Sequence, residues 1–107
     1  MPIGRQVKII SITGGTSSGT ATDIDAGHPW IVAIVGASSG SVSFCKLPDG
    51  AEIGDVAEVY SDGSQLTYIL APDSESFLNT GTNPSIGTDE GGVFCRKISA
   101  TVWVWNH

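Results

Sequence analysis

The stretch Thr101-Val102-Trp103-Val104-Trp105, near the end of the chain, decides the fold class. Successive side chains of a β-strand point to opposite faces, so Trp103 and Trp105 share one face while Val102 and Val104 share the other. Both faces are therefore apolar, whereas a strand with one face in water carries polar residues at every second position. We expect this strand either to lie in the core of its own subunit or to be covered by another subunit.

The segment of residues 6–12 at the other end of the chain has the same property. Ile10 and Ile12 lie on one side of it, and Val7 and Ile9 lie on the other. Two terminal strands with two apolar faces favour an oligomer whose chain ends pack together, although core burial within one subunit explains the same pattern. The predicted subunit interface consists of apolar residues from both strands: Val7, Ile9, Ile10, Ile12, Val102, Trp103, Val104 and Trp105.

Five further segments between these ends are rich in Val, Ile, Thr and aromatic residues, as strands are. They are residues 30–35, 41–47, 56–60, 65–71 and 93–99. No window repeats apolar residues with a helical period, and glycine, serine or threonine interrupts the chain every few residues. The sequence therefore predicts an all-β domain of about seven short strands without a substantial helix, built as a β-sandwich, a jelly roll or a small barrel.

Two Asp-Gly pairs mark turns between these segments. Pro48-Asp49-Gly50 follows residues 41–47, and Asp62-Gly63 separates residues 56–60 from residues 65–71. Asp-Gly readily adopts the positive φ angles that tight hairpins require. We therefore predict a β-hairpin between the segments on either side of Asp62-Gly63.

The 107 residues fit a single domain, 1–107, because a second domain would be too small to hold its own core. Within it, residues 1–22 form a candidate N-terminal arm, in which a strand is followed by a flexible loop of glycine, serine and threonine. The longest apolar run, residues 30–35, is far shorter than the roughly 20 residues that span a bilayer. No signal-peptide pattern is present at the start of the sequence, so we expect synthesis in the cytoplasm.

The charge balance argues against nucleic acid and against anionic membranes as partners. Lys and Arg number 5 against 11 Asp and Glu, and the formal net charge is −6. Phosphate backbones and anionic lipids are bound by clusters of basic side chains. The largest basic cluster here is the pair Arg96-Lys97.

Cys45 and Cys95 lie fifty residues apart, without CxxC spacing and without histidines nearby. This arrangement matches neither a zinc site nor a thioredoxin-like motif. Two buried free thiols and one cross-strand disulfide are both compatible with the sequence.

Two G-x-S-x-G patterns, at residues 15–19 and 36–40, resemble the nucleophile turn of a hydrolase. Neither is followed by a helix pattern, and the chain is too short for the α/β sheet that this motif requires. We interpret both as Gly/Ser-rich loops. The sequence therefore predicts no catalytic residue, and the protein is not expected to be an enzyme.

Asp23, Asp25 and His28 form the one cluster whose residue types suit a divalent cation. The remaining acidic ligands of a calcium loop are missing. Hydrogen bonds from Asp25 and His28 to local amides, in a turn before Pro29, explain the same residues. We predict neither a metal site nor a cofactor site.

The loop over residues 77–92, from Phe77 to Gly92, contains several glycines and is long enough to contact a ligand at its tip. A solvated connection between strands explains it equally well. The aromatic side chains of the chain could stack on sugars, but packing in a core or an interface accounts for them too.

Two segments resemble small β-structured virion proteins of tailed bacteriophages. They are Leu-Pro-Asp-Gly-Ala-Glu-Ile-Gly-Asp-Val-Ala-Glu-Val-Tyr at residues 47–60 and Phe-Cys-Arg-Lys-Ile-Ser-Ala-Thr-Val-Trp at residues 94–103. The likeness spans a little more than half of the chain and rests on structural motifs: a proline-led turn, a Gly-Asp strand entry and a tryptophan-bearing last strand.

Proteins of this family are capsid decoration or cement subunits, or fibre and spike domains, and are commonly trimers. The resemblance implies a trimeric structural protein of the virion, made in the host cytoplasm, that stabilises the capsid through contacts with the major capsid protein. The alternative is a receptor- or glycan-binding tip domain of a head or tail fibre, in which the loop over residues 77–92 makes the contact.

Overall fold

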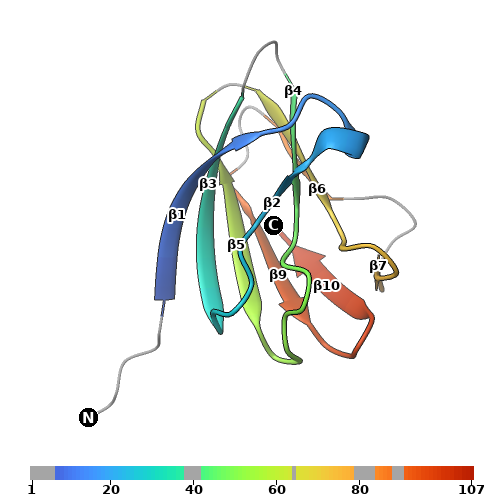
Figure 1. Ribbon diagram of the computed structural model, residues 1–107. Coiled ribbons are helices and arrows are strands. Elements are labelled where there is room, and N and C mark those ends of the chain that lie inside the picture. Colours follow the sequence, from blue (N-terminus) through green and yellow to red (C-terminus); the bar gives the residue numbers. More distant parts are fainter. Residues whose placement is uncertain (1–6, 38–41, 64, 79–83, 88–90) are drawn as a thin grey trace.

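The computed structural model describes residues 7–37, 42–63, 65–78, 84–87 and 91–107. Within these residues, ten strands form two sheets that face each other (Figure 1). Sheet A contains, in spatial order, β1 (Val7–Gly14), β3 (Trp30–Ala37), β5 (Val56–Ser61), β9 (Val93–Lys97), β10 (Val102–Asn106) and β7 (Ser76–Phe77). Sheet B contains β2 (Thr22–Asp23), β4 (Val42–Lys46), β6 (Leu66–Leu70) and β8 (Ser85–Ile86). One short 3-10 helix, η1 (Ser18–Thr20), lies between β1 and β2.

The chain alternates between the two sheets as it winds. In sheet A, β1, β3 and β5 are paired in parallel, and in sheet B, β2, β4 and β6 are also paired in parallel. Val7 lies opposite Trp30, 23 residues later, and Trp30 lies opposite Val56, 26 residues later. Each of these turns contributes one strand to each sheet, so the chain forms the stacked coils of a β-solenoid.

Similar residues lie on top of one another in successive coils. The Ser43 and Thr67 hydroxyls are register partners and hydrogen-bond in the core at 3.0 Å. Phe44 and Tyr68 are register partners on the outer face of sheet B, where their rings stack with centroids 5.0 Å apart. This vertical matching of side chains holds the parallel strands in register.

The prediction of an all-β domain without a substantial helix is confirmed. The finer expectation of a jelly-roll sandwich or a small barrel is not what the structure has, because parallel stacking of coils replaces antiparallel pairing over most of both sheets. All seven predicted strands are present among the described residues. Three strands of two residues each, β2, β7 and β8, were not predicted, because two residues are too few to show a period.

The predicted hairpin around Asp62-Gly63 is wrong. β5 lies in sheet A between β3 and β9, whereas β6 lies in sheet B between β4 and β8. Gly63 does adopt a positive φ of +129°, but it turns the chain through a corner from one sheet to the other. The Asp62 amide and the Gln65 side-chain amide both donate to the Val35 carbonyl oxygen at 2.8 Å, which ties this corner to the coil beneath it.

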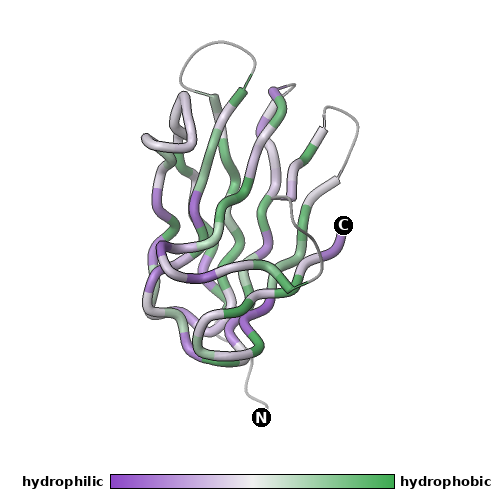
Figure 2. The backbone as a smooth tube through the Cα atoms, turned by 90° about the vertical axis from the view of Figure 1, so that its right-hand side faces the viewer, coloured by the Kyte–Doolittle hydropathy of each residue, from purple (hydrophilic) through white to green (hydrophobic). Residues whose placement is uncertain are grey.

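The core lies between the inner faces of the two sheets. In β3, Ile31, Ala33 and Val35 are buried while the residues between them are half-buried. Figure 2 shows hydrophobic stretches, in green, along the strands. The buried apolar cluster consists of Ile24, Ile31, Ala33, Val35, Cys45, Leu47, Ala51, Ala57, Val59, Ile69, Ile86, Val93, Cys95 and Trp103.

Both cysteines lie in this core as free thiols, one from each sheet. Burial raises the pKa of the Cys45 thiol to about 12, and burial together with the neighbouring Cys45 raises the pKa of the Cys95 thiol further. Both groups therefore remain protonated at neutral pH and are poor nucleophiles. They act as small apolar core residues.

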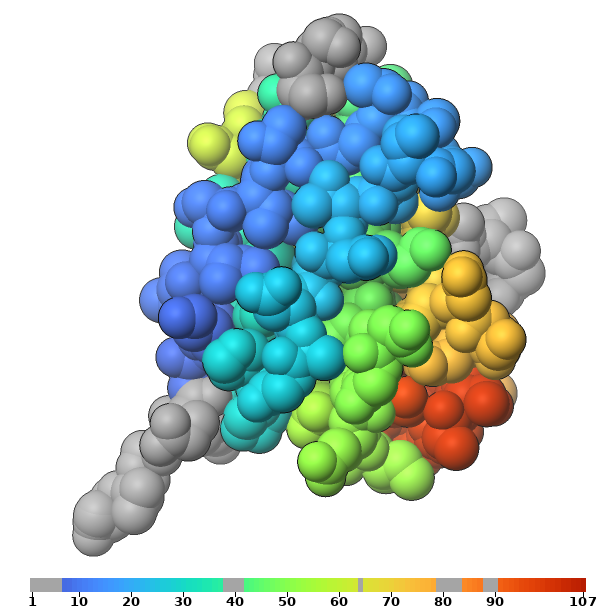
Figure 3. All heavy atoms as spheres, viewed as in Figure 1, coloured from blue at the N-terminus to red at the C-terminus, as the bar shows by residue number. Residues whose placement is uncertain are grey.

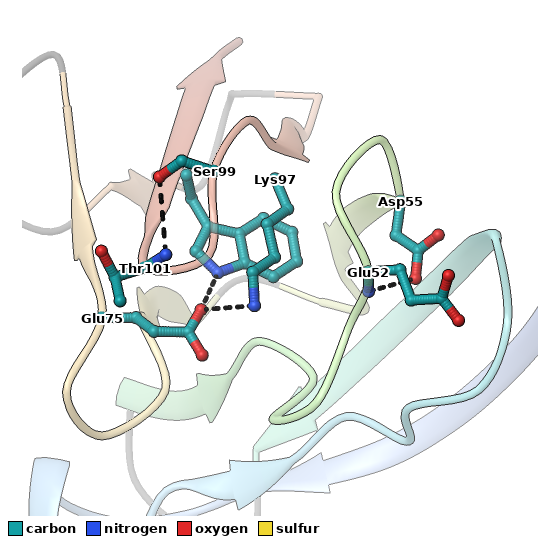
Figure 4. Close-up of polar contacts among 7 residues, drawn as sticks. Glu52, Asp55, Glu75, Lys97, Ser99 and Thr101 are labelled. Carbon is teal, nitrogen blue, oxygen red and sulfur yellow. Dashed lines mark hydrogen bonds and ion pairs between the residues drawn. The ribbon is translucent and has the colours of Figure 1, made fainter.

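The solenoid is closed at one end by antiparallel strands. β9 runs antiparallel to β5, and β10 runs antiparallel to β9. A buried polar contact joins this cap to the chain before β7: Glu75 Oε1 lies 3.1 Å from Lys97 Nζ and accepts a hydrogen bond from Trp103 Nε1 at 2.8 Å (Figure 4). The Lys97 and Glu75 side chains are only 5% and 9% exposed. Among the described residues, no helix is long and apolar enough to cross a membrane.

We predict that Glu75→Gln lowers the free energy of unfolding by about 3 kcal/mol, because it leaves the Lys97 ammonium buried without an opposite charge. Urea denaturation monitored by tryptophan fluorescence measures this loss. Asp73→Asn is the matched control, since Asp73 is 93% exposed and pairs with Lys46 at 3.2 Å on the surface. That control costs less than about 1 kcal/mol. Equal losses in the two variants would contradict the structural role of the buried pair.

Candidate functional site

The free edge of β1 is the first candidate site. Within the described residues β1 pairs only with β3, so the backbone groups on its other edge have no strand beside them. Figure 1 shows β1 at the margin of the molecule, and Figure 3 shows the same segment at the surface. Val7 is 46% exposed and Ile9 is 66% exposed. The first coil therefore presents an unpaired and apolar edge.

Pairing with β3 divides the side chains of β1 between two faces. Ile10 lies opposite buried Ala33, and Ile12 lies opposite buried Val35. Both isoleucines pack against the core. Val7 and Ile9 point to the outer face of sheet A. We call the free edge of β1 together with Val7 and Ile9 the β1 surface.

The structure divides the predicted interface residues between the core and the surface. Trp103 is fully buried at 0% exposure, and Trp105 packs against the core, so these two indoles stabilise their own chain. This corrects the expectation that Trp103 contacts another subunit. Val102 and Val104 are half-buried on β10, and with the β1 surface they stay candidates for a contact between subunits.

A cluster of rings around one carboxylate is the second candidate site, on the outer face of sheet A. Glu58 accepts hydrogen bonds from Trp30 Nε1 through Oε2 and from the Tyr60 hydroxyl through Oε1, the second at 2.6 Å. Phe94 is the cross-strand partner of Glu58, and its ring meets the Trp30 ring edge to face, with centroids 5.9 Å apart. The rings of Trp30 on β3, Tyr60 on β5 and Phe94 on β9 are thus gathered around the Glu58 carboxylate.

The Tyr60 phenol keeps its proton more firmly than an ordinary tyrosine. Its hydrogen bond to Glu58, together with partial burial and the negative charge of Glu58, raises the pKa of Tyr60. The hydroxyl is therefore a donor to Glu58, and its oxygen is free to accept only.

Because residue 92 is glycine, the Tyr60 ring can pack against the backbone just before β9. A Cβ atom at Gly92 would stand 2.6 Å from both Cδ1 and Cε1 of Tyr60, which is much closer than atoms can approach. At Gly91 an added Cβ would meet nothing within 4 Å. The position of the Tyr60 ring therefore depends on the lack of a side chain at Gly92, the residue before β9.

A hollow of about 390 Å³ opens beside this ring. We call it the Tyr60 pocket, and it is lined by Glu58, Tyr60, Gly91, Gly92, Val93, Phe94, Asn106 and His107. His107 Nδ1 lies 3.2 Å from the Gly92 carbonyl oxygen, which draws the end of the chain over the pocket. Sequence reasoning did not find this site, because its residues come from three strands. The sequence singled out the end of the loop over residues 77–92 and the aromatic side chains as possible contacts, but it did not bring Tyr60 and Phe94 together.

The residues considered for a metal site are not brought together. His28 lines a separate hollow of about 290 Å³ with Gly27, Pro29, Gly50, Glu52 and Asp55, and neither Asp23 nor Asp25 borders it. Asp55 Oδ2 accepts from the Glu52 amide at 2.9 Å, so this carboxylate forms a local turn (Figure 4). The described part of the chain holds no group of three His, Cys, Asp or Glu side chains arranged to bind a metal ion.

Of the two G-x-S-x-G patterns, the first lies around η1. The Ser17 hydroxyl is 3.0 Å from the Thr20 hydroxyl and serves the local turn. In the second pattern, residues 38–40 lie outside the described residues, as do residues 79–83 and 88–90 of the long loop.

Comparison with known proteins finds a likeness of fold to a solved structure. No family model matches the chain, and no curated protein matches it. One matching solved structure is described as the structure of a chaperone-substrate complex; the match has a TM-score of 0.57 at 22% identity. It covers 91% of this chain but 15% of that one, so this chain spans a small part of the length of the protein that it resembles. At this identity the likeness shows the fold alone.

We predict that Gly92→Ala displaces the Tyr60 ring and lowers the melting temperature, whereas Gly91→Ala leaves both unchanged. The physical reason is the 2.6 Å approach of a Cβ atom at position 92 to the ring, against open space at position 91. Thermal unfolding and the NMR chemical shifts of the Tyr60 ring measure the two effects. Identical ring shifts in wild type and Gly92→Ala would refute the packing described here.

Proposed function

We propose that this chain is a structural subunit that assembles with copies of itself through the β1 surface. The observation that carries the proposal is the free edge of an eight-residue strand with Ile9 exposed beside it. Unpaired strand edges readily add a strand from another chain. Monomeric proteins commonly protect such edges with charges, prolines or a covering loop.

The described part of β1 has little of this protection. Lys8 is the only charged residue in its sequence, Val-Lys-Ile-Ile-Ser-Ile-Thr-Gly, and proline is absent from it. A long edge that shows Val7 and Ile9 to solvent would be an aggregation hazard in a monomer. A partner that pairs with β1 would satisfy its backbone groups and cover both side chains.

The charge distribution favours a second copy as that partner. The chain as a whole has a formal charge of −6, so two copies repel each other over most orientations. β1 contains no acidic residue, and its register partners in β3 contain none either. Two copies therefore meet at the β1 surface without placing carboxylates opposite each other.

We infer that the assembled protein is a trimeric virion component, a decoration or cement subunit that binds the major capsid protein and stabilises the capsid. Support comes from the resemblance of residues 47–60 and 94–103 to such proteins. The acidic charge also disfavours binding to a packaged genome.

A second candidate function is recognition of a receptor or glycan by a tip domain of a head or tail fibre. The Tyr60 pocket favours it, because an exposed aromatic ring beside polar groups is suited to stacking on a sugar. A glycan array and a capsid-binding assay, run with the same protein, separate the two. A decoration subunit binds capsids and binds no glycan on the array.

We predict that Ile9→Lys converts the oligomer to a monomer at low micromolar concentration, because a charge on the outer side of β1 opposes pairing with another edge. Size-exclusion chromatography with light scattering measures the mass. Ile53→Lys is the matched control, since Ile53 is 64% exposed and Ile9 is 66% exposed, yet Ile53 lies outside the strands. That control should retain the wild-type mass.

A wild-type protein that is already monomeric and stable at these concentrations would refute assembly through β1. An oligomer that both Ile→Lys variants leave intact would also refute this interface. A mass of three chains supports the trimer, whereas a mass of two chains would support pairing of two β1 edges and reject the trimer.

A further inference from the structure

We propose that the Tyr60 pocket binds an organic cation, a ligand with an exposed ammonium group such as that of a lysine side chain or an amino sugar. The inference is independent of assembly through β1. It specifies the chemical class of ligand for the pocket that the glycan-binding candidate uses, and its amino-sugar arm rests on that candidate function. The argument uses the hydrogen-bonding capacity of the lining, its charge and its rings.

The central part of the pocket lining accepts hydrogen bonds. The Glu58 carboxylate can only accept, and it has lone pairs left after its two bonds to Trp30 and Tyr60. The Tyr60 hydroxyl donates its proton to Glu58, so it too can only accept from a ligand. A ligand that matches these groups must bring donors, and an ammonium group brings three donors and no acceptor.

Charge and aromatic rings select a cation among possible donors. Glu58 is the one acid lining the described pocket, and it is held in place from two sides by Trp30 and Tyr60. The whole chain carries a formal charge of −6, which attracts cations to its surface. Aromatic faces stabilise cations through their ring quadrupole, and both Tyr60 and Phe94 line the hollow.

One cationic side chain of the protein already lies over a ring of the pocket. The Arg96 guanidinium carbon lies 5.8 Å from the centre of the Phe94 ring, within the range of a cation–π contact. A cation from the same strand therefore already lies over that ring. Tyr60 is 37% exposed and remains accessible to a ligand from outside.

The pocket and the β1 surface lie on different parts of sheet A. β3 lies between β1 and β5, and β9 and β10 follow beyond β5. A strand added at the free edge of β1 would lie on the side away from β5, which is the nearest strand of the pocket.

The test is a titration of ¹⁵N-labelled protein followed by NMR. The probes are glucosamine and Nα-acetyl-lysine amide, each with its neutral N-acetylated counterpart. We expect both ammonium compounds to shift the amide signals of Gly91, Gly92 and Phe94, and the neutral compounds to leave them unchanged. The dissociation constants of glucosamine and Nα-acetyl-lysine amide then show whether the pocket prefers an amino sugar or a lysine side chain.

Glu58→Gln is the decisive variant, and we expect it to raise the dissociation constant about tenfold because it removes the charge and keeps the shape. The Gln amide still accepts from Trp30 Nε1 and can donate to the Tyr60 oxygen, so the ring cluster is retained. Glu52→Gln is the matched control, because it makes the same change beside the separate hollow near His28. It should bind as the wild type does.

Equal affinity of wild type and Glu58→Gln would overturn the inference. So would neutral N-acetylglucosamine binding as tightly as glucosamine, which would instead support the glycan-binding candidate. Binding of the ammonium probes by the monomeric Ile9→Lys variant is expected as well. It would show that the pocket does not depend on assembly.

Discussion

Parallel pairing of β1, β3 and β5 is the constraint on which the rest of the structure depends. Each coil of a solenoid buries its inner side chains against the facing sheet and its backbone edge against the next coil. A middle coil has two neighbours, but a first coil has one. Among the described residues β1 has one neighbouring strand and β3 has two, which accounts for the unpaired edge of β1 and the partial exposure of Ile10 and Ile12.

At the opposite end of sheet A the chain reverses direction, and β7 pairs with the first two residues of β10. β9 pairs antiparallel with β5, and the contact of Glu75 with Lys97 and Trp103 fixes the strands that follow. This reversal also creates the Tyr60 pocket. Antiparallel register sets Phe94 opposite Glu58 and brings Gly92 beneath Tyr60, so the end closure and the ligand-sized hollow have one origin.

Local sequence predicted the strands well but their partners poorly. All seven long strands were recognised, because alternation and β-branched residues are properties of a few neighbouring residues. The segment around Asp62-Gly63 shows the limit of this reasoning. Asp-Gly requires a positive φ at Gly63 in a hairpin and at a solenoid corner alike, and only the placement of β5 and β6 in different sheets distinguishes the two. For Trp103 the sequence left both core and interface open, and the burial of its indole decided for the core.

The sequence by itself determined the all-β class, the places of the strands, the lack of a helix pattern and the acidic charge. Each of these follows from composition or from short-range periodicity. Only the tertiary structure decided that the strands stack as parallel coils, that Val7 and Ile9 lie on a free edge, and that Trp30, Glu58, Tyr60 and Phe94 meet at one place. The physical reason is that these features depend on pairing between strands more than twenty residues apart, and the sequence of one strand does not specify which strand will lie beside it.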